Sequence, residues 1–254
     1  MFKNSQQNMK IGVTVKIIYD LEVKPEVNNG ILDYKTAKRM IDPIDETNIS
    51  AAIKFRETTP SVVITVFCLS KESDNDLLKR VLDMGVDEAV LVKINNYNES
   101  NVDGLTKSKV LKRLLTTEKY DLVLTGKSSS DNNSGFVGSA LTTFLGWRQL
   151  YRVCELVDKK TDQLTARCKS RNRIITFVVK LPCVLVCEFD KSERSVSTFD
   201  PTKAINKKID VKHVDKLNLT CCSCISVVNY TVSSKVRKVK VIDNVDTLMT
   251  TLFN

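Results

Sequence analysis

The sequence predicts an α/β protein: a doubly wound, mostly parallel sheet with helices on both faces, an antiparallel β-rich extension and a C-terminal arm. Three observations carry this prediction. Four short apolar segments lack the polar alternation of half-exposed strands, which indicates burial on both faces. Four segments with apolar residues at helical spacing alternate with them, a pattern typical of parallel sheets with right-handed crossovers. After Gly146 the pattern becomes β-rich.

The predicted parallel strands are rich in β-branched residues, which suit the interior of a sheet. Between the first strand and the first helix, the polar segment 23–34 contains the turn signal Asn28-Asn29-Gly30. This signal predicts a hairpin excursion from the sheet. The four buried strands are predicted at residues 11–19, 61–69, 88–94 and 121–125.

The predicted helices begin with recognisable signals. Pro43 stands near the start of the first helix, and Asp45 and Glu46 complement the dipole of its first turn. Ser73 or Asp74 is expected to cap the second helix. The helices are predicted from about Pro43 to Glu57 and at residues 73–84, 105–117 and 136–145.

The β-rich region after the fourth helix predicts antiparallel strands attached to the parallel sheet. These strands are expected at residues 149–157, 164–169, 174–180 and 184–189. Segment 235–241 is expected to form a further strand, and segment 245–253 a short terminal helix.

Composition and charge narrow the class of partner. The net charge of +9 is spread along the chain, and its two denser zones, 203–212 and 235–240, are not interleaved with aromatic residues. An acidic protein partner or a solvated face therefore fits better than RNA or DNA. No apolar run approaches the roughly 18 to 20 residues that a membrane crossing needs. We expect neither nucleic-acid binding nor a membrane span.

The cysteines indicate a reducing compartment, because eight of them accompany a single histidine in a globular-sized chain. The one cluster is Cys221, Cys222 and Cys224. A zinc site would need a fourth ligand and wider spacing, so small apolar residues in a strand are the better explanation. We predict no metal site.

The chain is organised around residues 120–146, YDLVLTGKSSSDNNSGFVGSALTTFLG. A buried strand leads through a polar, glycine-containing turn into a helix, and free N–H groups at such a helix start favour an anion. A Walker A loop is rejected, because its first glycine would fall at Asp121. Two interpretations stay open: a long surface loop, or a nucleotide pocket that uses the loop hydroxyls, Asp131 and the helix N-terminus.

Three loops are expected to converge at the carboxyl edge of the sheet, where ligands bind in such folds. They are the segment leading to Asp42-Pro43, the Cys68 end of the second strand and the loop from Gly126 to Gly135. Acid–base chemistry is not expected there, because no histidine or paired carboxylates flank the Gly126 loop. The sole histidine, His213, lies in a basic stretch and is expected at the surface. We predict no catalytic residues.

Several segments together resemble the β subunit of electron transfer flavoprotein. The strongest match is the stretch 120–147, and MIDPIDE at 40–46 and Met84-Gly85-Val86-Asp87 resemble family segments. Leu181-Pro182 before an apolar strand, and Lys203-Ala204 followed by KKIDV at 207–211, resemble later landmarks. Their order and spacing cover most of the chain from Ile11 onward.

The resemblance implies a heterodimer with an α subunit, which carries most of the binding domain for a shared FAD. Such a pair passes electrons from acyl-CoA and related dehydrogenases to a membrane quinone reductase. In this family the β subunit holds AMP, and in bifurcating relatives a second FAD takes that pocket. The resemblance places the pocket at Thr14, Asp42, Cys68, Gly126, Lys127, Asp131, Asn132 and Ser134. Backbone groups near Thr14 and Cys68 would contact adenine, and the Ser134 hydroxyl with the helix-entry N–H groups would hold phosphate.

The sequence departs from the family pattern at places that bear on partners. Asp42 replaces the usual asparagine before proline, and only Asp131 remains of three consecutive acids. In the loop implied to dock dehydrogenases, the leucine anchor falls at Thr198, beside Phe199 and before Lys203. Losing a buried apolar anchor worth about 2 kcal/mol would weaken docking unless Phe199 substitutes for it.

These inferences give an expected organisation and two alternatives. We expect a disordered or import-type N-terminus at 1–10, the nucleotide-binding domain with its β-rich extension at 11–190, and a docking loop with C-terminal arm at 191–254. The expected location is the mitochondrial matrix in a eukaryote or the cytoplasm in a bacterium. The alternatives are a stand-alone adenine-nucleotide-binding protein, and a paralogue that pairs with an α subunit but has lost dehydrogenase docking.

Overall fold

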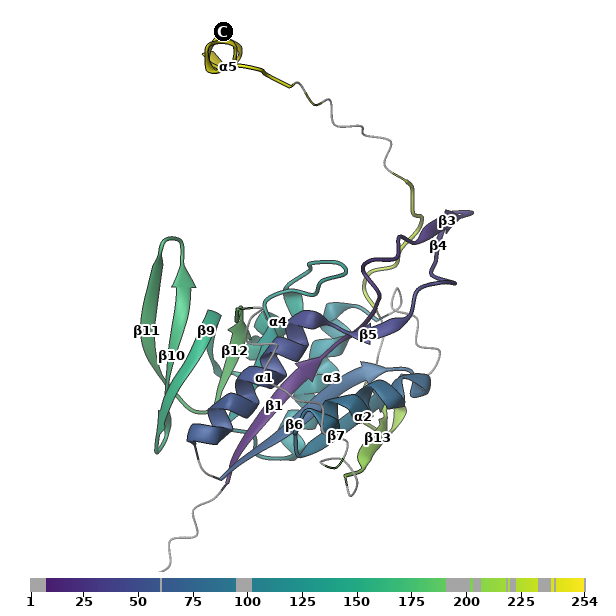
Figure 1. The fold of residues 1–254 in the computed structure, drawn as a ribbon. Helices are drawn as coiled ribbons and strands as arrows, with labels where there is room; N and C mark the ends of the chain where they lie inside the picture. The colour runs from purple at the N-terminus through teal and green to yellow at the C-terminus, as the bar shows by residue number, and fades with distance from the viewer. Residues whose placement is uncertain are drawn as a thin grey trace, which may run out of the picture.

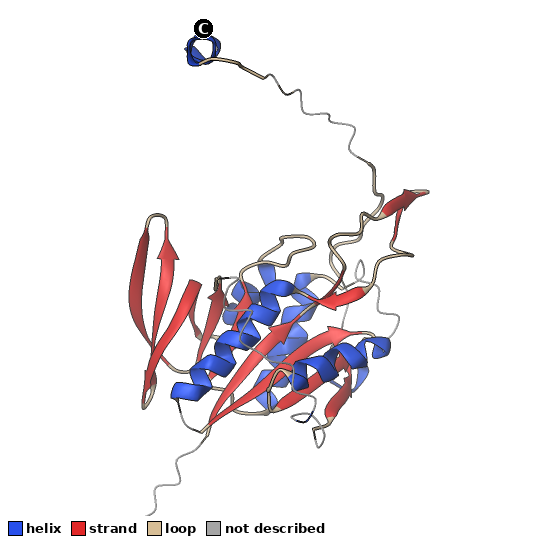
Figure 2. Cartoon of the chain, in the orientation of Figure 1, coloured by secondary structure: helices blue, strands red, loops and turns tan. Residues whose placement is uncertain are grey.

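The structure, a computed structural model, describes residues 8–59, 61–94, 102–190, 202, 207–217, 219, 223–232, 239 and 241–253. These residues form a nine-stranded sheet with the strand order β11-β10-β9-β12-β8-β1-β6-β7-β13. Figures 1 and 2 show helices in front of and behind this sheet. The predicted α/β class with a mostly parallel sheet is confirmed.

The centre of the sheet is parallel. Its strands are β1 (Met9–Val15), β6 (Val62–Ser70), β7 (Glu88–Lys93), β8 (Leu122–Gly126), β12 (Cys183–Cys187) and, at one edge, β13 (Ile209–His213). The helices are α1 (Pro43–Thr58), α2 (Asn75–Asp83), α3 (Gly104–Thr117), α4 (Phe136–Leu145) and α5 (Val245–Phe253), with short 3-10 turns η1 (Glu72–Asp74) and η5 (Val214–Leu217).

Two hydrophobic clusters lie on opposite faces of the sheet. Ile49 of α1 and Leu78 of α2 belong to the cluster on one face. Leu115 of α3 and Leu141 of α4 belong to the cluster on the other. Strand residues buried on both sides alternate between the clusters, which is why the sequence shows continuous apolar runs. The doubly wound arrangement is therefore confirmed.

The first predicted strand, residues 11–19, is wrong as a single strand. β1 ends at Val15, and β2 (Ile17–Tyr19) pairs antiparallel with β5 (Arg39–Ile41) in a separate small sheet. The break falls at Lys16, because its N–H donates to the Asp45 carboxylate at 2.8 Å and its carbonyl accepts the Asp42 N–H at 2.9 Å. These two bonds fasten the end of β1 to the start of α1.

The predicted hairpin excursion is confirmed. It consists of β3 (Glu26–Asn28) and β4 (Ile31–Asp33), which pair antiparallel. The turn residues Asn29 and Gly30 have φ values of 50° and 74°. Positive φ at both positions is the requirement of a tight hairpin turn that asparagine and glycine meet best.

The antiparallel extension is confirmed for three strands, β9 (Arg148–Lys160), β10 (Gln163–Ser170) and β11 (Arg173–Lys180). The prediction for its fourth member was wrong. β12 lies between β8 and β9 and is parallel to both. Its residues are all buried, and this two-sided burial is typical of an interior parallel strand rather than of a hairpin partner.

The C-terminal region matches the prediction in part. β13 was not predicted; it pairs with β7 in parallel, and its short alternation is obscured by charged neighbours. Val239 and Val241 are not in a strand, and the remainder of the predicted strand 235–241 lies outside the described residues. The terminal helix α5 is confirmed, and none of its side chains is buried.

Candidate functional site

The carboxyl edge of the sheet has a switch point at β1. From β1 the chain winds outward through β6 to β7, and then returns to place β8 on the opposite side of β1. In open α/β sheets, ligands bind in the crevice outside the strand ends at such a point. The loop that follows β8 and the start of α1 meet at this edge of the sheet, since the Ser130 N–H donates to Asp42.

Asp42 fastens the loop after β8 to helix α1. The carboxylate is fully buried and accepts the Ile44 N–H at 3.0 Å, which caps α1. It also accepts the N–H of Ser130 at 2.8 Å and the hydroxyl of Ser130 at 2.7 Å. Bonds to a buried carboxylate are among the stronger hydrogen bonds, so the loop is held against the helix start.

Lys16 and Asp131 hold the same loop to the end of β1. The Lys16 ammonium lies 2.5 Å and 2.6 Å from the two oxygens of Asp131 and 3.4 Å from the Ser129 hydroxyl. Burial opposes ionisation of Asp131, but the bonds from Lys16 outweigh it and keep the pKa of that carboxyl below its usual value.

Asn132 makes the turn within the loop. Its side-chain oxygen accepts the Ser129 hydroxyl at 2.7 Å and the Ser134 N–H at 3.1 Å. Together with the bonds of Asp42 and Lys16, these contacts fasten the loop to the end of β1 and the start of α1, while residues 131–134 stay exposed.

Helix α4 begins directly after this loop with an unblocked N-terminus. Gly135 precedes it in the left-handed conformation, with φ of 59°, and no side chain caps the first turn. A Cβ at Gly135 would lie 2.8 Å from the Lys127 carbonyl, so glycine is required there. The N–H groups of the first turn are thus without a side-chain cap, and the dipole favours an anion beside them.

Thr14 and Cys68 lie at the adjacent strand ends. The Thr14 hydroxyl donates to the Leu124 carbonyl at 3.5 Å, and Val15 is the register partner of Cys68. Cys68 is fully buried, and burial raises the pKa of its thiol. Its side chain points into the core, so contact with a ligand here would come from the backbone, as the sequence analysis expected.

Gly126 permits a close approach between the turn and α1. A Cβ at this position would lie 3.1 Å from the Ile44 side chain and 3.2 Å from Asp45. The Asp45 carboxyl is buried, and burial, followed by the nearby Asp42 charge, raises its pKa well above the usual value. A buried acid with a raised pKa therefore lies beside the turn.

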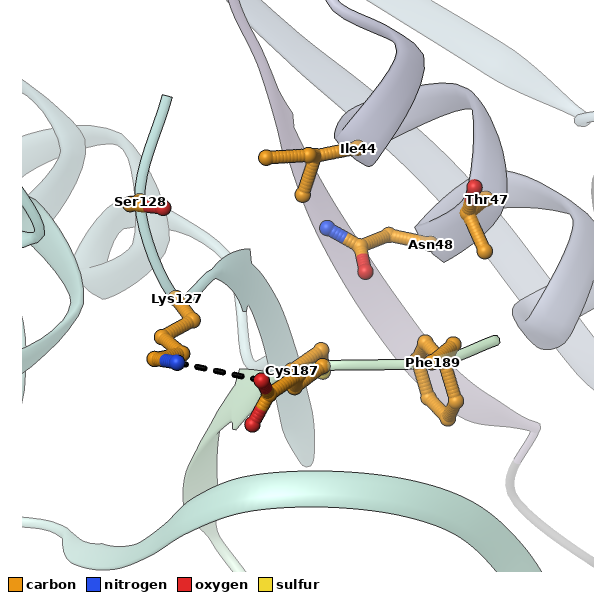
Figure 3. A pocket seen from close by; sticks show the side chains of 8 residues that line it. Ile44, Thr47, Asn48, Lys127, Ser128, Cys187 and Phe189 are labelled. Atoms are coloured by element: carbon orange, nitrogen blue, oxygen red, sulfur yellow. Dashed lines mark hydrogen bonds and ion pairs between the residues drawn. The ribbon is translucent and has the colours of Figure 1, made fainter. Parts of the chain in front are cut away.

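A cavity opens beside this turn, with an empty volume of about 430 Å³ that includes its open mouth. It lies between the start of α1 and the ends of β8 and β12 (Figure 3). Of the residues predicted for the site, Lys127 alone lines it. The lining residues are Ile44, Thr47, Asn48, Lys127, Ser128, Cys187, Glu188 and Phe189.

Glu188 joins the turn to the antiparallel extension. It accepts Lys127 Nζ at 3.0 Å and Arg152 Nε at 2.7 Å. Burial would raise the pKa of Glu188, but the two cations lower it overall. Glu188 and Arg152 were not predicted as site residues, because β12 brings them together from distant positions and no local spacing marks them.

The remaining predicted residues fall into two groups. His213 is half-buried at the end of β13, at the far edge of the sheet from β8. Thr198, Phe199 and Lys203 lie outside the described residues.

In the described part of the chain, no group of three or more His, Cys, Asp or Glu side chains is placed to hold a metal ion. None of the described helices has both the length and the apolar character of a membrane span.

The fold and the loops at the carboxyl edge of the sheet define the class of protein. It is a doubly wound α/β domain with polar loops gathered at the switch point of its sheet. A family model described as "Electron transfer flavoprotein domain" matches residues 30–216. This match covers well over half of the chain. The chain therefore belongs to the electron transfer flavoprotein family, and its relatives are β subunits.

Three relatives illustrate the similarity. A probable electron transfer flavoprotein subunit beta of Saccharomyces cerevisiae is 28% identical, over 73% of this chain and 72% of the relative. The human subunit beta is 26% identical, over 87% and 88%. The mitochondrial subunit beta of Oryza sativa subsp. japonica is 26% identical, over 97% and 98%. These modest identities, over 72–98% of each chain, describe a divergent member.

Proposed function

We propose that this chain is an electron transfer flavoprotein β subunit, pairing with an α subunit that carries most of the FAD-binding domain. The pair would shuttle electrons from acyl-CoA and related dehydrogenases to a quinone reductase, with AMP held in this chain. The observation that carries the proposal is the folded loop between β8 and α4 at the switch point of a family-matched domain.

The residues present fit an adenine nucleotide. The first turn of α4 offers N–H groups without a side-chain cap, and Ser134 adds a hydroxyl next to them. Two carboxylates lie near the proposed phosphate position, Asp42 and Asp131. They would not repel a phosphate strongly, because Asp42 accepts hydrogen bonds from Ser130 and Asp131 is paired with Lys16. Backbone groups near Thr14 and Cys68 are the proposed adenine contacts, and Gly126, Lys127 and Asn132 shape the turn between them.

The proposed function requires no acid, base or nucleophile from this chain. Bound flavin supplies the redox chemistry, and the polypeptide supplies a rigid frame and an approach surface for partners. This agrees with a site whose ionisable groups are engaged in fastening a loop. The proposed docking residues for dehydrogenases remain Thr198, Phe199 and Lys203. The proposed location is the mitochondrial matrix in a eukaryote or the cytoplasm in a bacterium.

Coexpression with an α subunit tests the proposal. We expect a one-to-one complex that retains FAD through purification, and no flavin on this chain expressed alone. A chain that stays monomeric beside the α subunit would contradict it. ATP turnover by the purified chain would instead favour the stand-alone nucleotide protein.

A second assay separates the paralogue from the full electron carrier. Thr198 replaces the leucine anchor, and this observation favours a subunit that pairs but does not dock dehydrogenases. Acyl-CoA dehydrogenase should reduce the FAD of the complex if docking is retained. A complex that holds FAD but is not reduced would identify the paralogue.

A further inference from the structure

The outer edge of β11 is an open strand edge with exposed apolar side chains. Within the described residues β11 pairs with β10 alone and ends the nine-stranded sheet. Ile174 is 65% exposed and Val178 is 64% exposed. Natural proteins protect sheet edges with charges, proline, bulges or covering segments, because a long apolar edge recruits other strands. β11 has charged residues only at its two ends, Arg173 and Lys180.

Both faces of this strand are apolar. Ile175 and Phe177 lie opposite Cys168 and Ala166 of β10, so they continue the buried face of the extension, yet they are 39% and 41% exposed. Ile174 and Val178 alternate onto the other face. A strand added beside β11 would cover side chains on both faces while it satisfies the open backbone groups.

The charge around the edge identifies the kind of strand that fits. Residues 148–182 contain nine basic and three acidic side chains, so the extension that carries this edge is itself positively charged. One of the acids, Glu155, is already paired with Arg167. Lys160 of β9 and Lys180 of β11 both pair with Gln163 of β10, so they lie at one end of the extension. Arg171 and Arg173 lie at the other end, in and after the turn between β10 and β11.

A second copy of this chain is a poor occupant of the edge. Antiparallel self-pairing would set Arg173 of one chain opposite Lys180 of the other, and parallel self-pairing would set like residues side by side. Like charges directly opposite each other destabilise a strand pair. The matching strand has apolar side chains in its middle and acidic residues at its ends.

We propose that β11 is a docking edge for an apolar strand with acidic ends, contributed by the subunit that pairs with this chain. The assignment to that subunit rests on the proposed function. Its backbone extends the sheet beyond β11, and its acidic ends lie beside Arg173 and Lys180. Pairing would then depend on both the apolar side chains of the edge and the ionic strength.

The test uses the full chain coexpressed with the α subunit. The double variant Ile174→Glu/Val178→Glu should weaken the complex about tenfold or more, because it removes two apolar contacts and adds repulsion toward acidic ends. Arg173→Glu/Lys180→Glu should weaken it most at low salt and reverse its salt dependence, because added salt then screens a repulsion instead of an attraction. The matched control is Val211→Glu, a substitution on β13 at the opposite edge of the same sheet.

Circular dichroism and thermal melting verify that each variant is folded. A second readout follows hydrogen exchange of peptide 173–180, whose amides should become protected on pairing. The proposal is overturned if the complex forms normally and both double variants match the Val211→Glu control. Self-association of the chain through this edge would also overturn the proposal. If the wild-type chain binds no α subunit, both this proposal and the proposed function fail.

Discussion

Two bonds from Ser130 to the buried Asp42 carboxylate hold the loop after β8 against the start of α1. Replacing Ser130 with alanine removes one hydroxyl bond to a buried carboxylate, at a cost of about 1.5–3 kcal/mol. Replacing Asp42 with alanine also removes the cap of α1, worth about 1 kcal/mol, and leaves the Ser130 N–H without its acceptor. We therefore expect Asp42→Ala to cost about 3–5 kcal/mol in the free energy of unfolding.

Urea unfolding followed by circular dichroism measures these costs in the single and double variants. The double variant should cost little more than Asp42→Ala alone, since Ser130→Ala then removes a bond that is already broken. Thr143→Ala is the control, because its exposed hydroxyl bonds only within α4, and its effect should stay within about 0.5 kcal/mol. Additive costs for Asp42 and Ser130, or a Ser130→Ala cost no larger than the control, would show that these two residues do not hold the loop together.

Three further predictions concern the same edge. Because burial raises the pKa of Asp45, the ionised carboxyl destabilises the folded state, and this cost is greatest above the folded pKa. The cost shrinks as pH falls through the folded pKa toward the ordinary value of 3.8, so stability rises over that window, and Asp45→Asn should flatten this part of the urea profile. Gly138→Ala places a Cβ 2.3 Å from Thr125 Oγ1 and 2.8 Å from Val186, and should cost about 1–3 kcal/mol in the same assay; an unchanged midpoint would show that α4 moves freely. Glu188→Gln should lower the free energy of unfolding by less than about 1 kcal/mol, because its partners Lys127 and Arg152 are about one-third exposed to solvent. A larger loss in thermal melts would mean that these ion pairs are better shielded from water than their exposure indicates.

The sequence was most informative where structure is set locally. Four of the parallel strands, β1, β6, β7 and β8, and the helices α1 to α4 follow from apolar periodicity, and Asn29-Gly30 predicts its hairpin, because these signals depend on neighbouring residues. Lys16 interrupts the first strand for a reason that local pattern does not contain. Its backbone bonds to Asp42 and Asp45, which lie more than 25 residues away.

The site shows the same division. The turn after β8 and the open start of α4 were predicted from glycine, polar and helical patterns. The contacts that fold the loop, Lys16 with Asp131 and Ser130 with Asp42, join residues about 90 to 115 positions apart. The ion pairs of Glu188 with Lys127 and Arg152 depend on the position of β12 between β8 and β9. An apolar run cannot reveal this position, because strands buried on both faces look alike in any order.

The proposed function has an adenine nucleotide bound at the loop between β8 and α4, in a subunit that serves the flavin of another chain. Mass spectrometry of the small molecules released from the native complex with an α subunit measures whether that nucleotide is present. One AMP per copy of this chain, alongside one FAD per complex, is the predicted result. A complex that carries its FAD and releases no adenine nucleotide beyond it would contradict the claim.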